Sequence, residues 1–319
     1  MKFAKLGNTD ITISKIIFGG WQSGKAMWVG IDDEQTIAAH RAAFEHGITT
    51  FDTAEGYGGG HSEQVLGAAL ADRRDEIVIL TKVGPGNLSA EKLVAACERS
   101  LTNLKTDRID LYQIHWPAGT FNTPVIPIEE TIGALVKLKE QGKIRAIGVS
   151  NFSGAQIAEA QQFGRIDSVQ PPYSLFWRQA EKDVIAAALR LSMSVLAYSP
   201  LAQGLLTGKF GPVHGLAKED VRSNNRLFKE ETYPKAIDAV NRLRPIAERN
   251  NISMAHLALA WLLALPGAHA IVGARNAEQA SQNAAGADVT LSYKDLAEIE
   301  LIGKSVSDDL LNVNPAMWA

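Results

Sequence analysis

Short runs of apolar and β-branched residues alternate with amphipathic stretches along most of the chain. Runs of this kind are typical of buried strands, whereas apolar positions three and four apart are typical of helices packed on a sheet. The pattern predicts eight strands, at residues 15–20, 49–54, 77–83, 109–116, 144–150, 168–173, 194–199 and 269–273. A helical pattern follows each strand, at residues 33–47, 62–72, 89–104, 128–141, 153–163, 180–191, 234–265 (broken near Asn250) and 277–286.

Eight strand–helix pairs without a linker between them predict a single domain that spans residues 1–319. At this chain length, parallel strands joined by helices close into a (β/α)8 TIM barrel, so we expect this α/β fold. Residues 1–14 are polar and rich in turn formers, and we expect them to form a hairpin at one end of the barrel. An additional C-terminal helix is predicted at residues 292–305.

Composition narrows the range of partners. The chain has 46% hydrophobic and 21% charged residues and a formal charge of −3, so neither a nucleic-acid nor a membrane partner is expected. The first residues lack the apolar core of a secretion signal, and Cys97 is the single cysteine, which suits a cytoplasmic location. The histidines are dispersed, so no metal site is predicted. We expect a monomer or a weak homo-oligomer.

Four residues with chemical potential lie at or just after the ends of predicted strands: Asp52, Tyr57, Lys82 and His115. In a parallel barrel these strand ends meet at one mouth, where such folds place their active sites. A carbonyl group that accepts hydride develops negative charge on its oxygen and needs a nearby acid. We expect Tyr57 to be this acid, Lys82 to lower the pKa of the phenol, Asp52 to hold Lys82, and His115 to orient the carbonyl oxygen.

Each of these residues also has a structural interpretation. Asp52 could cap a turn, Tyr57 could be an exposed aromatic residue in a glycine-rich loop, and His115 could serve packing. Lys82 is harder to explain in this way, because a lysine at the end of an apolar strand is costly unless it is paired. Residues 19–26 match part of a phosphate-binding loop, but Ala26 stands where a hydroxyl would bind magnesium.

A family signature surrounds Asp52, in the segment Gly47-Ile48-Thr49-Thr50-Phe51-Asp52-Thr53-Ala54-Glu55-Gly56-Tyr57-Gly58. Companion pieces follow in order: Leu80-Thr81-Lys82-Val83, Ile114-His115-Trp116-Pro117, Gly148-Val149-Ser150-Asn151-Phe152, Gln170-Pro171-Pro172-Tyr173, Tyr198-Ser199-Pro200-Leu201 and Val272-Gly273-Ala274-Arg275. Together they resemble the aldo-keto reductase superfamily from about residue 2 to residue 283. The last piece resembles the bacterial branch with a Gly-Ala-Arg cofactor loop.

The resemblance implies that the cofactor is NADPH or NADP, with NAD less expected. The nicotinamide end would be bound by Ser150, Asn151, Gln170 and Tyr198. The pyrophosphate would face the loop after the seventh strand, at Ser199, Leu201, Gln203 and Gly204. The adenosine end would face Gly273, Arg275, Gln279 and Asn283. Trp21, Asp52, Lys209 and Gln282 would also belong to the cofactor site. Residues 201–233, an unusually long loop, would clamp the cofactor.

The implied activity is NADPH-dependent reduction of aldehydes or ketones to alcohols, with the small carbonyl substrate near Trp21, Tyr57 and Trp116. Two alternatives stay open: a lyase that forms a Schiff base on Lys82, and a nicotinamide-binding regulatory subunit. The preference for NADP would depend on Arg275. It would be the one strong cation there, because Asn276 and Gln279 stand where many relatives carry another.

Overall fold

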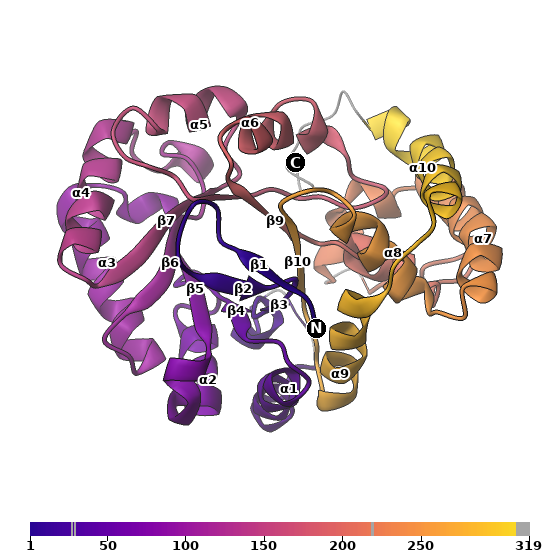
Figure 1. The fold of residues 1–319 in the computed structure, drawn as a ribbon, viewed down its shortest axis with the longest axis horizontal. Helices are drawn as coiled ribbons and strands as arrows, with labels where there is room; N and C mark the ends of the chain where they lie inside the picture. The colour runs from indigo at the N-terminus through magenta and orange to yellow at the C-terminus, as the bar shows by residue number, and fades with distance from the viewer. Residues whose placement is uncertain (27, 29, 218–219, 311–319) are drawn as a thin grey trace.

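The computed structural model describes residues 1–26, 28, 30–217 and 220–310. Eight parallel strands form a closed barrel, which confirms the predicted fold (Figure 1). In barrel order the strands are β10 (Ala268–Val272), β3 (Ile16–Gly19), β4 (Thr50–Asp52), β5 (Val78–Val83), β6 (Ile109–Ile114), β7 (Ile144–Ser150), β8 (Ser168–Gln170) and β9 (Ser194–Tyr198).

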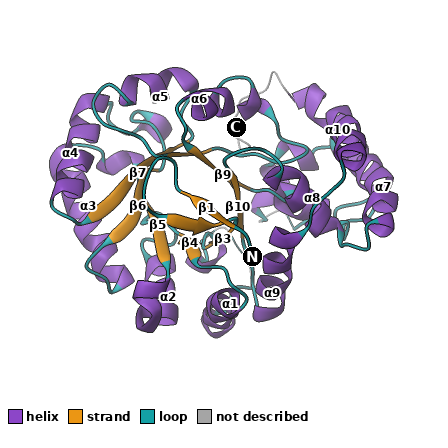
Figure 2. Ribbon diagram, viewed as in Figure 1, coloured by secondary structure: helices purple, strands orange, loops and turns teal. Residues whose placement is uncertain are grey.

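Helices surround this barrel on the outside (Figure 2). They are α1 (Asp33–Glu45), α2 (His61–Leu70), α3 (Ala90–Leu104), α4 (Ile128–Glu140), α5 (Gly154–Ala160), α6 (Val184–Arg190), α7 (Tyr233–Arg249), α8 (Met254–Leu263), α9 (Ala277–Ala285) and α10 (Tyr293–Ser307). The predicted break near Asn250 and the extra C-terminal helix are both confirmed. After the break a new helix, α8, begins, and Ser253 is its N-cap because the Ser253 hydroxyl accepts a hydrogen bond from the His256 amide.

The predicted N-terminal hairpin is present as β1 (Phe3–Lys5) and β2 (Thr12–Ser14), which pair antiparallel. Its apolar side chains Leu6 and Ile13 are fully buried and pack with Leu80 in the inner core cluster. Figure 1 shows the hairpin across one opening of the barrel. The loops that follow the barrel strands therefore build the other opening.

The barrel interior changes from apolar to polar along the strands. Leu80 and Leu111 belong to the inner core and pair in register between β5 and β6. Side chains two positions apart on a strand face the same side. Lys82 and Gln113, the next register pair, therefore also face the interior, one layer nearer the mouth.

The long connection after β9 ends one residue earlier than predicted, because Tyr233 already belongs to α7. The described part of this loop is anchored rather than free. Leu205 and Leu227 are fully buried, in segments that contact helices α7 and α8. Short turns of 3-10 helix shape the connection, at Ala202–Thr207, Val221–Asn224 and Arg226–Phe228.

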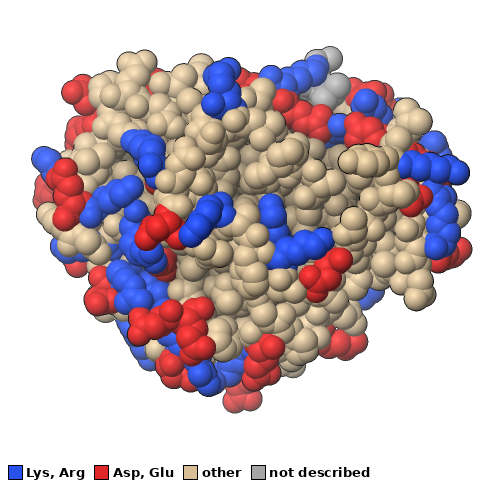
Figure 3. Space-filling view, viewed as in Figure 1, with Lys and Arg blue, Asp and Glu red and all other residues tan. Residues whose placement is uncertain are grey.

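On the face shown in Figure 3, acidic and basic side chains are interspersed. Among the described helices, none combines the length and the apolar character that are needed to cross a membrane.

Candidate active site

The four predicted catalytic side chains come together at the mouth of the barrel. Asp52 ends β4, Tyr57 lies in the turn after it, Lys82 lies near the end of β5, and His115 follows β6. The Lys82 Nζ atom lies 2.6 Å from Asp52 Oδ1 and 3.3 Å from the Tyr57 hydroxyl. The rings of Tyr57 and His115 meet edge to face, with centroids 5.4 Å apart. The four side chains thus form one connected group.

Lys82 is fully buried, and its ammonium group has three acceptors. It donates to Asp52 Oδ1, to the Thr53 carbonyl oxygen at 2.8 Å, and to the Tyr57 hydroxyl. Burial by itself lowers the pKa of Lys82, but attraction to Asp52 and Tyr57 outweighs it, so the net pKa is raised above 10.5. Lys82 is therefore an ammonium ion at neutral pH.

The net pKa of Tyr57 is raised above its ordinary value, although Lys82 acts in the expected direction. Burial is the largest cause, because it penalises the phenolate, and the charge of Asp52 adds to it. Lys82 does lower the pKa as expected, but by less than burial raises it. Tyr57 therefore carries its proton at neutral pH and can donate it.

His115 has a pKa well below its ordinary 6.5, because of its burial and the positive charge of Lys82. A neutral imidazole donates a hydrogen bond from one nitrogen and accepts one at the other. The ring is held through its backbone, since the His115 carbonyl oxygen accepts a hydrogen bond from Asn151 Nδ2 at 3.0 Å. His115 can therefore direct a hydrogen bond toward a carbonyl oxygen beside Tyr57.

Two side-chain amides hold the second oxygen of Asp52. The Nε2 atoms of Gln170 and Gln113 lie 2.9 Å and 3.3 Å from Asp52 Oδ2, and Gln170 Nε2 also donates to Gln113 Oε1 at 3.2 Å. Sequence reasoning missed Gln113. Its signal was an uncharged polar residue two positions after Leu111, on the same side of the strand as that leucine.

A close backbone approach fixes the turn that carries Tyr57. Gly58 has a φ of +65°, and a Cβ atom there would lie only 2.2 Å from the Gly24 carbonyl oxygen. Glycine is therefore required for both conformation and space. The Ser62 hydroxyl adds a hydrogen bond to the Gly20 carbonyl oxygen at 2.7 Å. Tyr57 is thus held against the loop after β3.

The residues expected at the nicotinamide end are also brought together. The Ser150 hydroxyl donates to the Gln170 carbonyl oxygen at 2.8 Å, and Asn151 Nδ2 lies 3.1 Å from Ser150 Oγ. The Tyr198 hydroxyl donates to Asn151 Oδ1 at 2.9 Å. These contacts link the ends of β7, β8 and β9. Their side chains therefore form a polar wall beside the Tyr57 group.

The loop after β9 contains three successive residues in the left-handed region. Ala202, Gln203 and Gly204 have φ values of 48°, 55° and 101°, and Ser199 just before them has a φ of 54°. Turns of this kind can direct backbone N–H groups into a concavity that suits anions. Leu201, which precedes the turn, is half-buried. Both amide atoms of Gln203 are buried without a hydrogen-bond partner among the described residues.

Two residues expected at the adenosine end shape the loop itself. Gln279 Oε1 accepts a hydrogen bond from the Arg275 amide at 3.0 Å, while Asn276 Oδ1 caps α9 through the Gln279 amide at 2.9 Å. Asn283 Nδ2 donates to the Gly273 carbonyl oxygen at 3.1 Å. Gln279 and Asn283 therefore position the backbone around Arg275 before any ligand binds.

Two other predicted cofactor residues, Lys209 and Gln282, are exposed. Gln282 Nε2 donates to Glu278 within the same helix at 3.0 Å. Among the described residues, neither side chain contacts the Tyr57 group, the polar wall beside it or the loop around Arg275.

Arg275 stacks on Trp28 together with a second arginine. The guanidinium carbons of Arg275 and Arg222 lie 5.5 Å and 6.0 Å from the centroid of the Trp28 ring. Trp21 meets Trp28 edge to face at 5.1 Å. Burial and the charge of Arg222 lower the pKa of Arg275. The expectation that Arg275 is the one strong cation here was therefore wrong.

An aromatic rim extends from His115 to the surface. The ring centroid of Trp116 lies 6.5 Å from that of His115, and the centroid of Phe121 lies 5.1 Å from that of Trp116. Phe121 is 70% exposed. Sequence reasoning missed Phe121, because nothing in the irregular segment 117–127 indicates which side chains face the mouth.

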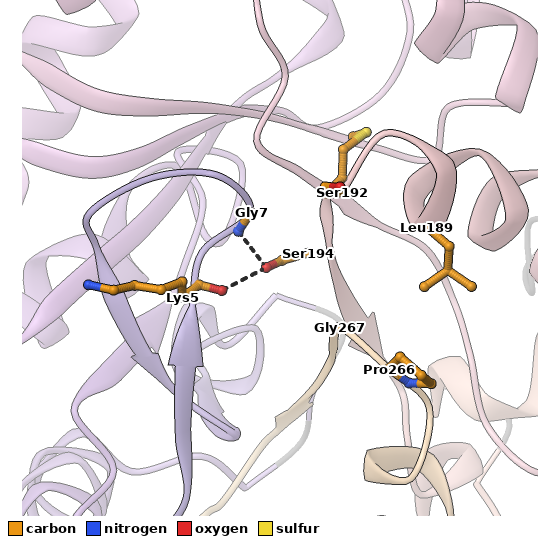
Figure 4. A pocket seen from close by; sticks show the side chains of 8 residues that line it. Lys5, Gly7, Leu189, Ser192, Ser194, Pro266 and Gly267 are labelled. Atoms are coloured by element: carbon orange, nitrogen blue, oxygen red, sulfur yellow. Dashed lines mark hydrogen bonds between the residues drawn. The ribbon is translucent and has the colours of Figure 1, made fainter.

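A surface cleft at the hairpin end of the barrel lies apart from this group (Figure 4). It is lined by Lys5, Gly7, Ser194 and neighbouring residues, and the Ser194 hydroxyl bridges the two hairpin residues. The Ser194 hydroxyl thus holds the hairpin to β9. Among the described residues that line the cleft, Lys5 is the titratable one.

A parallel barrel with a buried Asp–Lys pair, a protonated tyrosine and a neutral histidine at its mouth defines a class of enzymes suited to carbonyl chemistry. The model of the aldo/keto reductase family matches residues 15–304. The chain therefore belongs to the aldo/keto reductase family.

Individual relatives agree with this assignment. The chain is 35% identical to the NADH-specific methylglyoxal reductase of Escherichia coli, over 92% of this chain and 96% of that protein. Its fold matches the glycerol dehydrogenase AKR11B4 from Gluconobacter oxydans with a TM-score of 0.87 and 32% identity, over 99% of each chain. An aldo/keto reductase from Klebsiella pneumoniae in complex with NADP and acetate gives a TM-score of 0.76 at 32% identity, over 94% of this chain and 95% of that chain.

Proposed function

We propose that this protein is an NADPH-dependent reductase that converts aldehydes or ketones to alcohols with Tyr57 as the general acid. The observation that carries this proposal is the buried chain of contacts from Asp52 through Lys82 to the Tyr57 hydroxyl, at 2.6 Å and 3.3 Å. An ammonium ion next to a protonated phenol suits proton donation to a carbonyl oxygen that gains negative charge.

The chemistry divides between the cofactor and the chain. A bound nicotinamide supplies the hydride that adds to the carbonyl carbon. Tyr57 gives its proton to the carbonyl oxygen, and Lys82 stabilises the phenolate that is left. Asp52 keeps Lys82 charged, and the neutral His115 orients the oxygen through a hydrogen bond. Trp116 and Trp21 would line the substrate side.

The residues at the mouth fit such a cofactor. Ser150, Asn151 and Gln170 offer donors and acceptors for a carboxamide, and Tyr198 offers a ring beside them. Gln203 has buried amide atoms without a partner among the described residues, next to a left-handed turn that suits a pyrophosphate. We propose the remainder of residues 201–233 as a clamp over this site.

The preference for NADPH over NADH is proposed from Arg275, whose guanidinium stacks on Trp28 near the start of α9. A charge-assisted hydrogen bond with a phosphate contributes about 1.5–3 kcal/mol, or roughly 10- to 150-fold in affinity. The relatives differ on this point, since one is named NADH-specific and another was crystallised with NADP.

The Schiff-base alternative needs a neutral Lys82 amine as the nucleophile. The raised pKa of Lys82 and its three acceptors oppose this. The regulatory alternative is disfavoured because all four expected catalytic positions carry the expected side chain. Each of these side chains also contacts another member of the group.

The direct experiment follows NADPH absorbance with a panel of aldehydes and ketones that includes methylglyoxal. We expect NADPH consumption with at least one small carbonyl compound. If NADPH binds but no carbonyl in the panel is reduced, the reductase proposal is rejected in favour of a binding subunit.

A further inference from the structure

The turn that carries Tyr57 is tied to the loop after β5 by Glu55, which lies two residues before the tyrosine. The Glu55 amide donates to the Lys82 carbonyl oxygen at 3.2 Å. The Glu55 carboxylate oxygen Oε1 accepts one hydrogen bond from the Gly84 amide and another from Asn87 Nδ2, both at 2.8 Å. Glu55 therefore links the turn to the end of β5 through its backbone and through its side chain.

The second carboxylate oxygen of Glu55 has a weaker partner. Arg99 Nη2, on α3, lies 3.3 Å from Glu55 Oε2. The Arg99 side chain is 55% exposed, so solvent screens this ion pair, whereas the Glu55 side chain is only 13% exposed. The link between the turn and the loop after β5 therefore depends on the reach of Oε1 to Gly84 and Asn87 more than on the pairing with Arg99.

On its other side, the turn packs against the loop after β3. A Cβ atom on Gly24 would lie 2.6 Å from the Tyr57 carbonyl carbon, so the two backbones are in close contact. Tyr57 is thus held between the loops after β3 and β5, and Glu55 provides a hydrogen-bonded link on the β5 side.

The contact between Lys82 and Tyr57 depends on where this turn lies. Lys82 Nζ is 2.6 Å from Asp52 Oδ1 and 2.8 Å from the Thr53 carbonyl oxygen. Its distance to the Tyr57 hydroxyl is 3.3 Å, the longest of the three. N–H···O hydrogen bonds usually span about 2.7–3.2 Å, so a small displacement of the turn away from β5 would break the contact with Tyr57 first.

We propose that Glu55 is a positioning residue for the proton donor, because it holds the turn so that the Tyr57 hydroxyl stays in contact with Lys82. This inference rests on the proposed function. Without the Glu55 link, the hydroxyl would move away from the ammonium ion that stabilises the phenolate after proton transfer. Proton donation would then slow. The polar wall beside the site lies at the ends of β7, β8 and β9, so the affinity for NADPH should change little.

The alkaline limb of the pH profile separates this role from a direct effect of the Glu55 charge. The described titratable groups around the Tyr57 hydroxyl are Lys82, Asp52, His115 and Tyr198. Lys82 lowers the pKa of Tyr57, so a weaker contact between them moves the limb to higher pH. Removal of the negative charge of Glu55 by itself would move the limb to lower pH, because an anion disfavours the phenolate.

The test is single-turnover reduction of an aldehyde that the wild type reduces, by enzyme loaded with NADPH, from about pH 7 to 11. Glu55→Ala removes the link, and Glu55→Asp keeps the charge but is one methylene shorter. For both variants we expect a rate constant lower by about three- to thirtyfold, less than the ~10²–10⁴-fold loss of the acid itself, and an alkaline limb at higher pH. Glu55→Gln keeps the reach and one acceptor oxygen, so its rate constant should stay within about threefold of the wild type.

Arg99→Ala is the matched control, because it removes the exposed partner of Glu55 and leaves both bonds to Oε1 in place. We expect it to react at the wild-type rate. A variant that is only less stable would lose the amplitude of the single turnover but keep its rate constant.

The inference is overturned if Glu55→Asp reacts at the wild-type rate, if Glu55→Gln is as slow as Glu55→Ala, or if the slow variants have their alkaline limb at lower pH. If Glu55→Ala does not fold, the comparison of Glu55→Asp with Glu55→Gln decides. If the wild type reduces no carbonyl compound, the proposed function itself fails, so the two failures can be told apart.

Discussion

Replacing Lys82 by methionine separates the charge of the ammonium ion from the volume of the side chain. Asp52 is 3% exposed and would be left as a buried carboxylate whose partner is gone. Removing one member of a buried ion pair costs about 3–5 kcal/mol, because the remaining charge is uncompensated. The raised pKa of Lys82 means that its side chain is an ammonium ion at pH 7, and that the stability it contributes is lost only as the pH rises through this raised pKa.

The double variant Lys82→Met/Asp52→Asn provides the control. It removes the unpaired charge, while Gln170 and Gln113 can still bond to the oxygen of the new amide. Neutral replacements for a buried ion pair are often tolerated, so its stability should lie within about 1–2 kcal/mol of the wild type. Both variants should lose carbonyl reduction by about 10²–10⁴-fold, because the phenolate has lost its cation.

Urea denaturation at pH 7, followed by tryptophan fluorescence, measures the free energy of unfolding of all three proteins. The reasoning would be refuted if Lys82→Met were as stable as the wild type. It would equally be refuted if the double variant were no more stable than Lys82→Met.

Three further predictions follow from the same site. The pKa of His115 lies well below 6.5 and that of Tyr57 lies above 10.0. We therefore expect kcat/KM to be constant from pH 6.5 to 10 and to fall at higher pH, as Tyr57 loses its proton. A transition in kcat/KM near pH 7 would contradict this. Arg275→Ala should lower the NADPH-over-NADH affinity ratio by at least about tenfold, and an unchanged ratio in equilibrium titrations would remove Arg275 from the phosphate site. Stopped-flow fluorescence should resolve a slow step after NADPH binding, as residues 201–233 rearrange; a single fast phase argues against a clamp.

The barrel could be predicted because each strand is a short apolar run between turns, and each helix has its own periodicity. The strand ends at Lys82 and His115 also pointed to one mouth, since parallel strands in a barrel bring their ends together. The net pKa of Tyr57 could not be predicted, because it depends on how far the ring is buried. The pairing of Arg222 with Trp28 likewise depends on contacts between loops that are distant in the sequence and have no periodic signal.

Single-turnover reduction by the wild type and by Tyr57→Phe tests the central claim most directly. Enzyme loaded with NADPH is mixed with an aldehyde that the wild type reduces, and the loss of NADPH absorbance is followed. A general acid contributes about 10²–10⁴-fold, so Tyr57→Phe should be slower by this factor while its dissociation constant for NADPH stays within a few-fold. Reduction by Tyr57→Phe at the wild-type rate would contradict the assignment of Tyr57 as the proton donor.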